Sequence, residues 1–168
     1  MTLSMYQASV PVFLRGLENL SAILAKGAAH AEAKKIDPAV FINARLFPDM
    51  LALARQVQIA SDAAKGCTAR LAGAEVPSYP DTETTFPELQ ARIAKTVDFV
   101  KGFSAAQIDG SEERTCVLKI RGEDMKFRGQ DYLFKLSLPN FFFHVTTTYD
   151  ILRHNGVELG KMDYLGRS

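Results

Sequence analysis

Residues 50–71 read MLALARQVQIASDAAKGCTARL, and the spacing of apolar residues in this stretch decides the fold. Apolar or small residues recur at alternating steps of three and four positions. They are Met50, Leu53, Val57, Ala60, Ala64, Cys67 and Leu71. This spacing puts them all on one side of an α-helix, which is typical of a helix buried in a bundle. The polar residues Arg55, Gln58 and Asp62 are predicted to point away from that side.

Further stretches carry the same helical period. The first covers residues 4–26, with Gly27 as a possible end, although residues 28–35 could extend the helix. The next covers residues 85–102 and starts with a Thr-x-x-Glu capping box. The last covers residues 139–155 and stops at an Asn-Gly pair. The inner face predicted for this last helix is Leu138, Phe142, Val145, Tyr149 and Leu152.

Between the third and fourth of these helices the period changes to two, which indicates a β-hairpin. The turn is predicted at residues 122–124. One face would carry Cys116, Leu118, Ile120, Met125 and Phe127. The other face would carry Val117, Lys119, Arg121, Lys126 and Arg128. The sequence therefore predicts an all-α class, a four-helix bundle with a small β-hairpin between helices three and four.

The connector over residues 71–85 bears on the order of the helices. It is rich in Pro and Thr and favours an extended path. About 14 extended residues reach at most about 45–50 Å, whereas a helix of two dozen residues is about 36 Å long. The connector therefore permits an up-down-down-up arrangement without requiring it. No linker divides the chain, so residues 1–168 are expected to form a single domain.

Composition excludes several classes of protein. Hydrophobic residues make up 47% of the 168 residues, which excludes intrinsic disorder. The net charge of +1 gives no sign of an electrostatic nucleic-acid binder. No apolar run approaches the roughly 20 residues of a membrane span. Two cysteines far apart in the sequence, with no recognisable signal peptide, lead us to expect a cytoplasmic protein.

Residue spacing offers little catalytic chemistry. His144 and His154 are separated by about 15 Å along a helix and about 80° around it, so they cannot share one metal ion. His144 lies at the edge of the apolar face, either bonded to a neighbouring helix or acting as a ligand or general base in a cleft. Cys67 belongs to the apolar side of its helix and Cys116 to a strand, and no motif of a nucleophile or a phosphate loop is present.

The run Phe141-Phe142-Phe143 spans about 200° of a helix, so one face cannot bury all three rings. Either the hairpin or the long connectors cover Phe143, or a second copy of the protein does. An exposed aromatic patch is typical of an interface. We expect a homodimer through a surface formed by Phe143, Asp150 and His154.

Three segments together resemble a known family. They are RLFPDMLALARQVQIASDAAKG (residues 45–66), ETTFPELQARIAKT (83–96) and LPNFFFHVTTTYDILRHNGVELGKMDYLG (138–166). They resemble the bacterial domain-of-unknown-function family DUF1993, which is placed in the DinB/YfiT-like superfamily of proposed metalloenzymes. The resemblance implies an up-down-down-up four-helix bundle that is frequently dimeric.

The resemblance also implies a metal site. Members of the superfamily hold a divalent metal with one histidine from helix two and an HxxxH pair from helix four, and some are thiol-dependent transferases. His144 matches the first histidine of that pair, Thr148 stands at the second, and Arg55-Gln56 stand where helix two supplies its ligand. His144 is then the only candidate metal ligand, and one imidazole with an amide and a hydroxyl is a weak set for Zn²⁺ or Ni²⁺.

The sequence therefore favours a cytosolic DinB-like bundle of undetermined activity without the complete three-histidine site. One alternative is a metal- or thiol-dependent transferase-like enzyme with an altered site, in which Gln56, His144 and Thr148 line a cleft with Asn140 and Tyr149 nearby. Another is a non-enzymatic, dimeric ligand-binding or interaction module. The expected partners are a second copy and a small-molecule ligand, with neither nucleic acid nor membrane. A divalent metal is implied by the resemblance and disfavoured by the missing ligands.

Overall fold

Long helices make up most of the computed structural model, which describes residues 3–120 and 122–166 and, for Ile120, the backbone alone. They are α1 (Met5–Lys34), α3 (Leu53–Ala72), α4 (Phe86–Lys101) and α7 (Leu138–His154). The shorter elements are α2 (Pro38–Ile42), α5 (Ala105–Ile108), β1 (Thr115–Ile120), β2 (Glu123–Arg128), α6 (Gly129–Asp131), the π-helix η1 (Tyr132–Ser137) and α8 (Lys161–Leu165). Among the helices described, none is long and apolar enough to cross a membrane.

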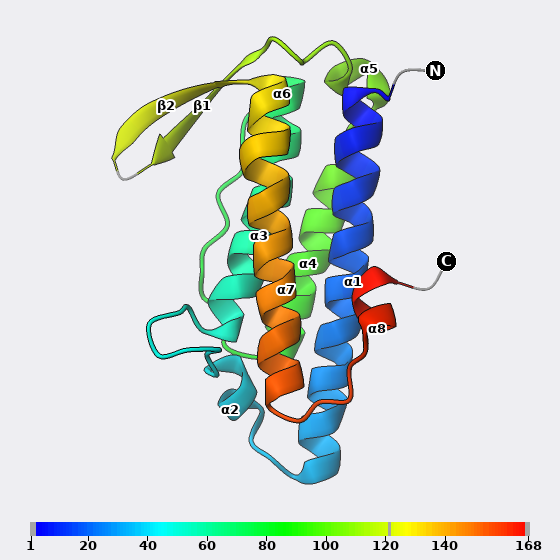
Figure 1. The fold of residues 1–168 in the computed structure, drawn as a ribbon, viewed down its shortest axis with the longest axis vertical. Helices are drawn as coiled ribbons and strands as arrows, with labels where there is room; N and C mark the ends of the chain where they lie inside the picture. Colours follow the sequence, from blue (N-terminus) through cyan, green and yellow to red (C-terminus); the bar gives the residue numbers. More distant parts are fainter. Residues whose placement is uncertain (1–2, 121, 167–168) are drawn as a thin grey trace.

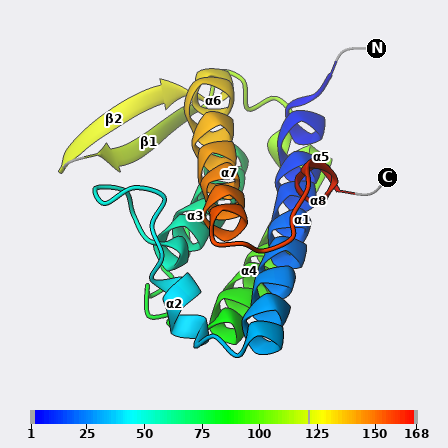
Figure 2. The same cartoon turned by 60° about the horizontal axis from the view of Figure 1, so that its bottom comes forward.

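The long helices lie side by side, as Figures 1 and 2 show. Helix α3 packs against α4 and α7, and α1 packs against the same two helices. In Figure 1, α1 and α7 run toward one end of the molecule, whereas α3 and α4 run toward the other. The apolar core lies between them, and its fully buried phenylalanines are Phe13 of α1, Phe41 of α2 and Phe141 of α7.

Helix α1 continues through Gly27 to Lys34, so the longer of the two predicted helices is the one that forms. A Cβ atom on Gly27 would lie 3.1 Å from Leu152 of α7 and 3.3 Å from Phe86 of α4. Gly27 therefore lets three helices approach closely instead of ending α1. The helix ends at Lys35, which adopts a left-handed conformation at φ 55°.

A second glycine of α1 positions α7. A Cβ atom on Gly16 would lie 2.4 Å from the ring of Phe141, closer than any real contact. That ring is fully buried and meets Phe13 edge to face, with 5.1 Å between ring centroids. Because Gly16 has no side chain, the ring of Phe141 can pack closely against α1 and contact Phe13.

The inner face predicted for α7 is wrong in part. Val145 and Leu152 are buried as expected, but Phe142 is 36% exposed and Tyr149 is only half-buried. The buried positions instead include Phe141, the residue before Phe142. One residue corresponds to about 100° around a helix. Counting only apolar residues displaced the predicted face, because three of the buried residues of α7 are polar, namely His144, Thr147 and Thr148.

The start predicted for that helix, near Pro139, is confirmed, because α7 begins at Leu138. The helical turns of α6 and η1, which the sequence analysis did not predict, lead into it from Gly129. Pro139 lies in the first turn of α7, where a missing backbone N–H is tolerated. A proline that can start a helix thus sits within a longer helical run.

The apolar side predicted for α3 is confirmed from Leu53 to Leu71, and Met50 lies before the helix begins. Arg55 and Asp62 are partly exposed, as the period indicates. Gln58 is a correction, because this residue is 2% exposed and donates a hydrogen bond to Glu83 at 2.9 Å. The connector between α3 and α4 covers it.

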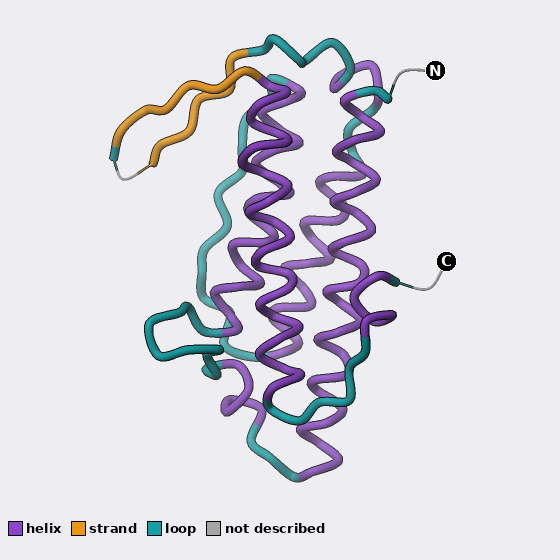
Figure 3. Tube along the Cα trace, viewed as in Figure 1, coloured by secondary structure: helices purple, strands orange, loops and turns teal. Residues whose placement is uncertain are grey.

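That connector runs alongside the helices as an extended segment, drawn as a loop in Figure 3. Arg92 of α4 fixes it, donating to the backbone oxygen of Pro80 at 3.0 Å and pairing with Asp81 and Glu83 at 3.1 Å each. Tyr79 adds a second contact, since the ammonium of Lys65 lies 3.9 Å from the centre of its ring. The connector is therefore held by buried cations of α3 and α4.

Strands β1 and β2 form a two-stranded antiparallel sheet. Ile120 pairs with Glu123, so the strands are joined by residues 121–122 and not by the predicted 122–124 turn. Arg121, placed on the outer face by the sequence analysis, lies outside the described residues. Cys116 is 2% exposed, as predicted for the inner face, but Met125 is 43% exposed. The sheet projects away from the helices in Figure 1.

Candidate functional site

His144 contacts α3 through a single well-defined hydrogen bond. Its Nδ1 atom lies 2.6 Å from Oε1 of Gln56, and the side chain is 7% exposed. The other end of the Gln56 amide donates from Nε2 to the backbone oxygen of Leu51 at 2.9 Å. That second bond orients the amide so that its oxygen faces the imidazole. Nδ1 must then carry the proton, which leaves the lone pair on Nε2.

Burial keeps this imidazole neutral. It lowers the pKa of His144 from 6.5 to about 4, because the charged form loses its hydration inside the molecule. No carboxylate within the described residues pairs with His144 to oppose this effect. At neutral pH the residue is a hydrogen-bond donor at Nδ1 and no cation.

The other residues of the predicted cleft do not join this pair. Thr148 is fully buried, and its hydroxyl donates to the backbone oxygen of His144 at 2.9 Å. Asn140 lies one helical turn before His144 and lines a separate hollow with Arg70. Tyr149 packs against Tyr164 of α8, with 6.2 Å between ring centroids. The structure thus brings His144 together with Gln56, while the other three side chains are engaged elsewhere.

Neither thiol is prepared for nucleophilic chemistry. Cys67 is fully buried, and burial raises its pKa to about 12. Cys116 is 2% exposed, and burial raises its pKa as well. A thiol acts as a nucleophile only as the thiolate. Both cysteines therefore behave as small apolar residues at neutral pH.

The three successive phenylalanines have three different surroundings. Phe141 is buried, Phe142 is 36% exposed and Phe143 is 55% exposed, so the hairpin does not cover Phe143. Along the same side of α7, Asp150 is half-buried and His154 is exposed. The predicted dimer surface is thus accessible at its two ends and partly covered at its centre.

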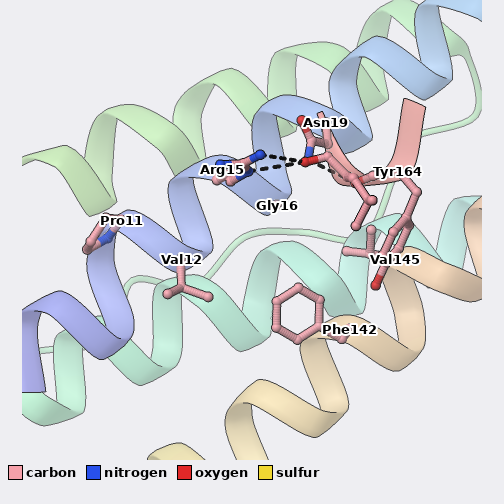
Figure 4. Close-up of a pocket in the computed structure, with 9 residues that line it drawn as sticks. Pro11, Val12, Arg15, Gly16, Asn19, Phe142, Val145 and Tyr164 are labelled. Carbon is pink, nitrogen blue, oxygen red and sulfur yellow. Dashed lines mark hydrogen bonds between the residues drawn. The ribbon is translucent and has the colours of Figure 1, made fainter. Parts of the chain in front are cut away.

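An apolar groove, which the sequence analysis missed, lies between α1, α7 and α8 (Figure 4). Its volume is about 380 Å³, and Val12, Phe142 and Val145 form much of its wall. The sequence analysis placed Phe142 on the inner face of its helix, whereas the ring lines this groove. Apolar residues of α1 reach the groove because Gly16 presents no side chain there.

Arg15 and Asn19, at this groove, bind the backbone of α8. Arg15 donates to the backbone oxygen of Leu165 at 2.9 Å, and Asn19 donates to that of Tyr164 at 2.9 Å (Figure 4). These bonds hold α8 against α1. The remaining lining is apolar, so the groove suits an apolar occupant better than a charged one.

The family model for the domain of unknown function DUF1993 matches residues 5–165, nearly the full length of the chain. The chain belongs to the DUF1993 family. A DinB family member from Shewanella denitrificans, solved by crystallography, is 43% identical to it with a TM-score of 0.87. The match covers 97% of this chain and 92% of that one, consistent with the DinB-like superfamily. A comparison with curated proteins finds no match.

In this DUF1993 chain the residues at the superfamily's metal-ligand positions do not suit a metal ion. The Nδ1 proton of His144 and the oxygen of Gln56 are bonded to each other, and the Thr148 hydroxyl is bonded to the backbone of α7. One imidazole lone pair remains, on Nε2, whereas Zn²⁺ sites use three or four nitrogen, sulfur or carboxylate ligands. Across the described residues, no group of three or more His, Cys, Asp or Glu side chains could hold an ion.

Proposed function

We propose that this DUF1993 chain is a single-domain, up-down-down-up four-helix bundle that binds a ligand without a metal ion and without covalent catalysis. The directions of α1, α3, α4 and α7 support the bundle, and the sheet between α5 and α6 is its one β element among the residues described. Residues 1–168 form the domain. Two free thiols, at Cys67 and Cys116, support a cytoplasmic location.

The hydrogen bonds from His144 through Gln56 to Leu51 carry this proposal. They join α7 to α3 at the positions where the family resemblance implies metal ligands. A neutral imidazole bonded to an amide needs no counter-ion, and burying it costs little once its donor is satisfied. This hydrogen bond therefore joins the two helices without a metal ion, and the atoms that form it are not available as metal ligands.

The groove between α1, α7 and α8 is the binding surface that the geometry favours. Its volume of about 380 Å³ is within the range of small-molecule pockets. Its walls are apolar, and its polar neighbours Arg15 and Asn19 already have backbone partners. We infer that the occupant is a small, uncharged, apolar molecule.

A metal titration tests the first part of the proposal. Wild-type protein titrated calorimetrically with Ni²⁺, Zn²⁺ and Mn²⁺ is expected to bind none of them at one specific site. The double variant Gln56→His/Thr148→His restores three imidazoles and is expected to gain Zn²⁺ affinity. Stoichiometric binding to wild type that disappears in His144→Ala would contradict the proposal.

A neutral fluorescent probe tests the second part. N-phenyl-1-naphthylamine is expected to bind wild type with increased emission. Val12→Trp fills the groove and is expected to weaken binding by about tenfold. Val117→Trp makes the same change on the exposed sheet and should bind like wild type. Equal binding by wild type and Val12→Trp would place the probe elsewhere and refute the groove.

The exposed ring of Phe143 favours a second role, self-association. We propose a twofold homodimer through Phe143, Asp150 and His154, because a 55% exposed aromatic ring is typical of an interface. Sedimentation equilibrium should show a dimer for wild type and a monomer for Phe143→Asp. Phe134→Asp changes another exposed ring, 45% exposed, and should stay dimeric. A monomeric wild type would rule the dimer out.

A further inference from the structure

A polar hollow lies where β1 meets α3 and η1, apart from the groove and from His144. Its volume is about 420 Å³. The polar side chains that line it include Arg70, Lys119, Tyr132, Ser137 and Asn140. They come from four different elements, and their types are those that recognise a negatively charged group.

Arg70 brings a charge that the protein leaves uncompensated. Its Nε donates to the backbone oxygen of Val117 and its Nη1 to the hydroxyl of Tyr132, each at 3.2 Å. The other three N–H groups of the guanidinium have no partner in the described part of the chain, and no described carboxylate pairs with it. A guanidinium with free N–H groups suits a carboxylate or a phosphate.

The acidic residue at the rim does not cancel this charge. Asp62 lines the same hollow, but its carboxylate lies 2.9 Å from Lys65 and 3.0 Å from Arg92. Lys119, in contrast, forms no ion pair within the described residues. The hollow therefore carries positive charge from both Arg70 of α3 and Lys119 of β1.

The π-helix η1 places two hydroxyl groups at this hollow. Hydrogen bonds of a π-helix join residues i and i+5, so Tyr132 and Ser137 lie one turn apart on the same face. Both side chains line the hollow. In an α-helix the same two residues would point about 140° apart. A π-helix is energetically poor and is frequent at functional sites.

Gly66 gives Arg70 its position. It lies inside α3 with an ordinary helical backbone, where Ala would be the more stable residue. A Cβ atom at Gly66 would lie 2.6 Å from Nη1 of Arg70. The missing side chain lets the guanidinium fold back over the helix beside Tyr132. Gly66 is thus a positioning residue for Arg70.

We propose that this hollow binds a small organic anion, a carboxylate or a phosphate monoester carried on a short apolar body. Arg70 and Lys119 contact the anionic group, and the amide of Asn140 donates to it. Ile59, Leu118 and Leu136 line the same hollow and contact the apolar body. The site is separate from the apolar groove, so either can fail without the other.

Titration followed by NMR tests this site, with benzoate, phenyl phosphate, inorganic phosphate and benzyl alcohol as probes. Benzoate or phenyl phosphate is expected to shift the signals of Arg70, Ser137 and Asn140, and the tighter of the two identifies the anionic group. Benzyl alcohol has the body without the charge and should bind far more weakly. Absence of binding by both aromatic anions at about 10 mM, a ligand level that detects even weak sites, would overturn the proposal.

Variants separate binding from folding. Arg70→Gln is expected to weaken anion binding by about tenfold, the effect of losing one charge-assisted contact. Gly66→Ala should raise the melting temperature and yet weaken binding, a combination that a purely structural glycine would not give. Lys126→Gln removes one charge from the exposed sheet outside the hollow and should bind like wild type. Unchanged affinity in Arg70→Gln, or in Gly66→Ala, would refute the role assigned to that residue.

Discussion

Arg92 of α4 and Arg70 of α3 differ in how completely their N–H groups are used. Arg92 is 1% exposed and has protein partners at all three guanidinium nitrogens, among them Ser61 at 2.7 Å and Asp62 at 3.0 Å. Arg70 is half-buried and has partners for two of its five N–H groups. Arg92 therefore stabilises the fold, whereas Arg70 has three N–H groups available to a ligand.

The comparison extends to His144. Its Nδ1 proton and the Gln56 amide satisfy each other, as the groups around Arg92 do. Buried polar groups that are fully bonded add rigidity, and partly bonded ones near a surface leave room for a ligand. A substitution that removes a fully bonded group should therefore lower the stability of the protein. One that removes a partly bonded group should instead weaken ligand binding.

The largest expected effect is that of Arg92→Met. It leaves Glu83, which is 13% exposed, without its cation and frees the connector from α4. Loss of one partner from a buried ion pair costs about 3–5 kcal/mol. Urea denaturation measures this, and Arg55→Met is the matched control, because Arg55 pairs with Asp81 at the surface. That control should cost less than about 1 kcal/mol, and equal losses in the two variants would contradict the comparison.

Next in size is the pH dependence due to His144. Its pKa is 6.5 when unfolded and about 4 when folded, so between these values the unfolded chain binds more protons. Stability should therefore be fully present above about pH 6.5 and fall as the pH drops toward 4, by at most about 3 kcal/mol.

Denaturation of wild type and His144→Gln over this pH range isolates the effect. The carboxylates titrate in both proteins, so the difference between the two curves belongs to His144. The stability of wild type relative to the variant should decrease as the pH falls. Parallel curves would show that the imidazole is not buried in its neutral form.

Gln56→Leu should have a smaller effect. It leaves the Nδ1 proton of His144 and the backbone oxygen of Leu51 without the partners seen here. An unsatisfied buried group costs about 1–3 kcal/mol, which urea denaturation at pH 7.5 can measure. Gln56→Glu keeps an acceptor and adds a charge, so it should raise the pKa of His144. Full stability in Gln56→Leu would mean that the bond is not needed.

The smallest expected effect on stability is that of Arg70→Gln. Its two bonds lie partly in solvent, so the free energy of unfolding should change by less than about 1 kcal/mol. Urea denaturation beside Arg92→Met gives the direct comparison. A loss as large as that of Arg92→Met would make Arg70 a structural residue.

The sequence predicted local structure correctly where the residue pattern of a single helix determines it. The apolar side of α3 and the capping box of Thr85 and Glu88 follow from spacing alone, and both form. It failed where another segment decides burial. Gln58 is buried because the connector crosses it, and no helical period contains that information.

The candidate site shows the same limit. His144 and Gln56 could be paired from the family resemblance, although 88 positions separate them. The groove of Phe142 and the hollow of Arg70 could not be predicted, since each is enclosed by elements distant in sequence. The π-helix η1 also leaves no signal in the period of apolar residues, because it is a local change of hydrogen bonding.

The protonation state of His144 tests the central claim most directly. Long-range ¹H–¹⁵N NMR at pH 7 should show a neutral imidazole with its proton on Nδ1, unchanged when one equivalent of Zn²⁺ is added. This result follows from the bond to Gln56 and the pKa of about 4. A proton on Nε2, or a shift of the imidazole signals with Zn²⁺, would contradict a bundle that works without a metal.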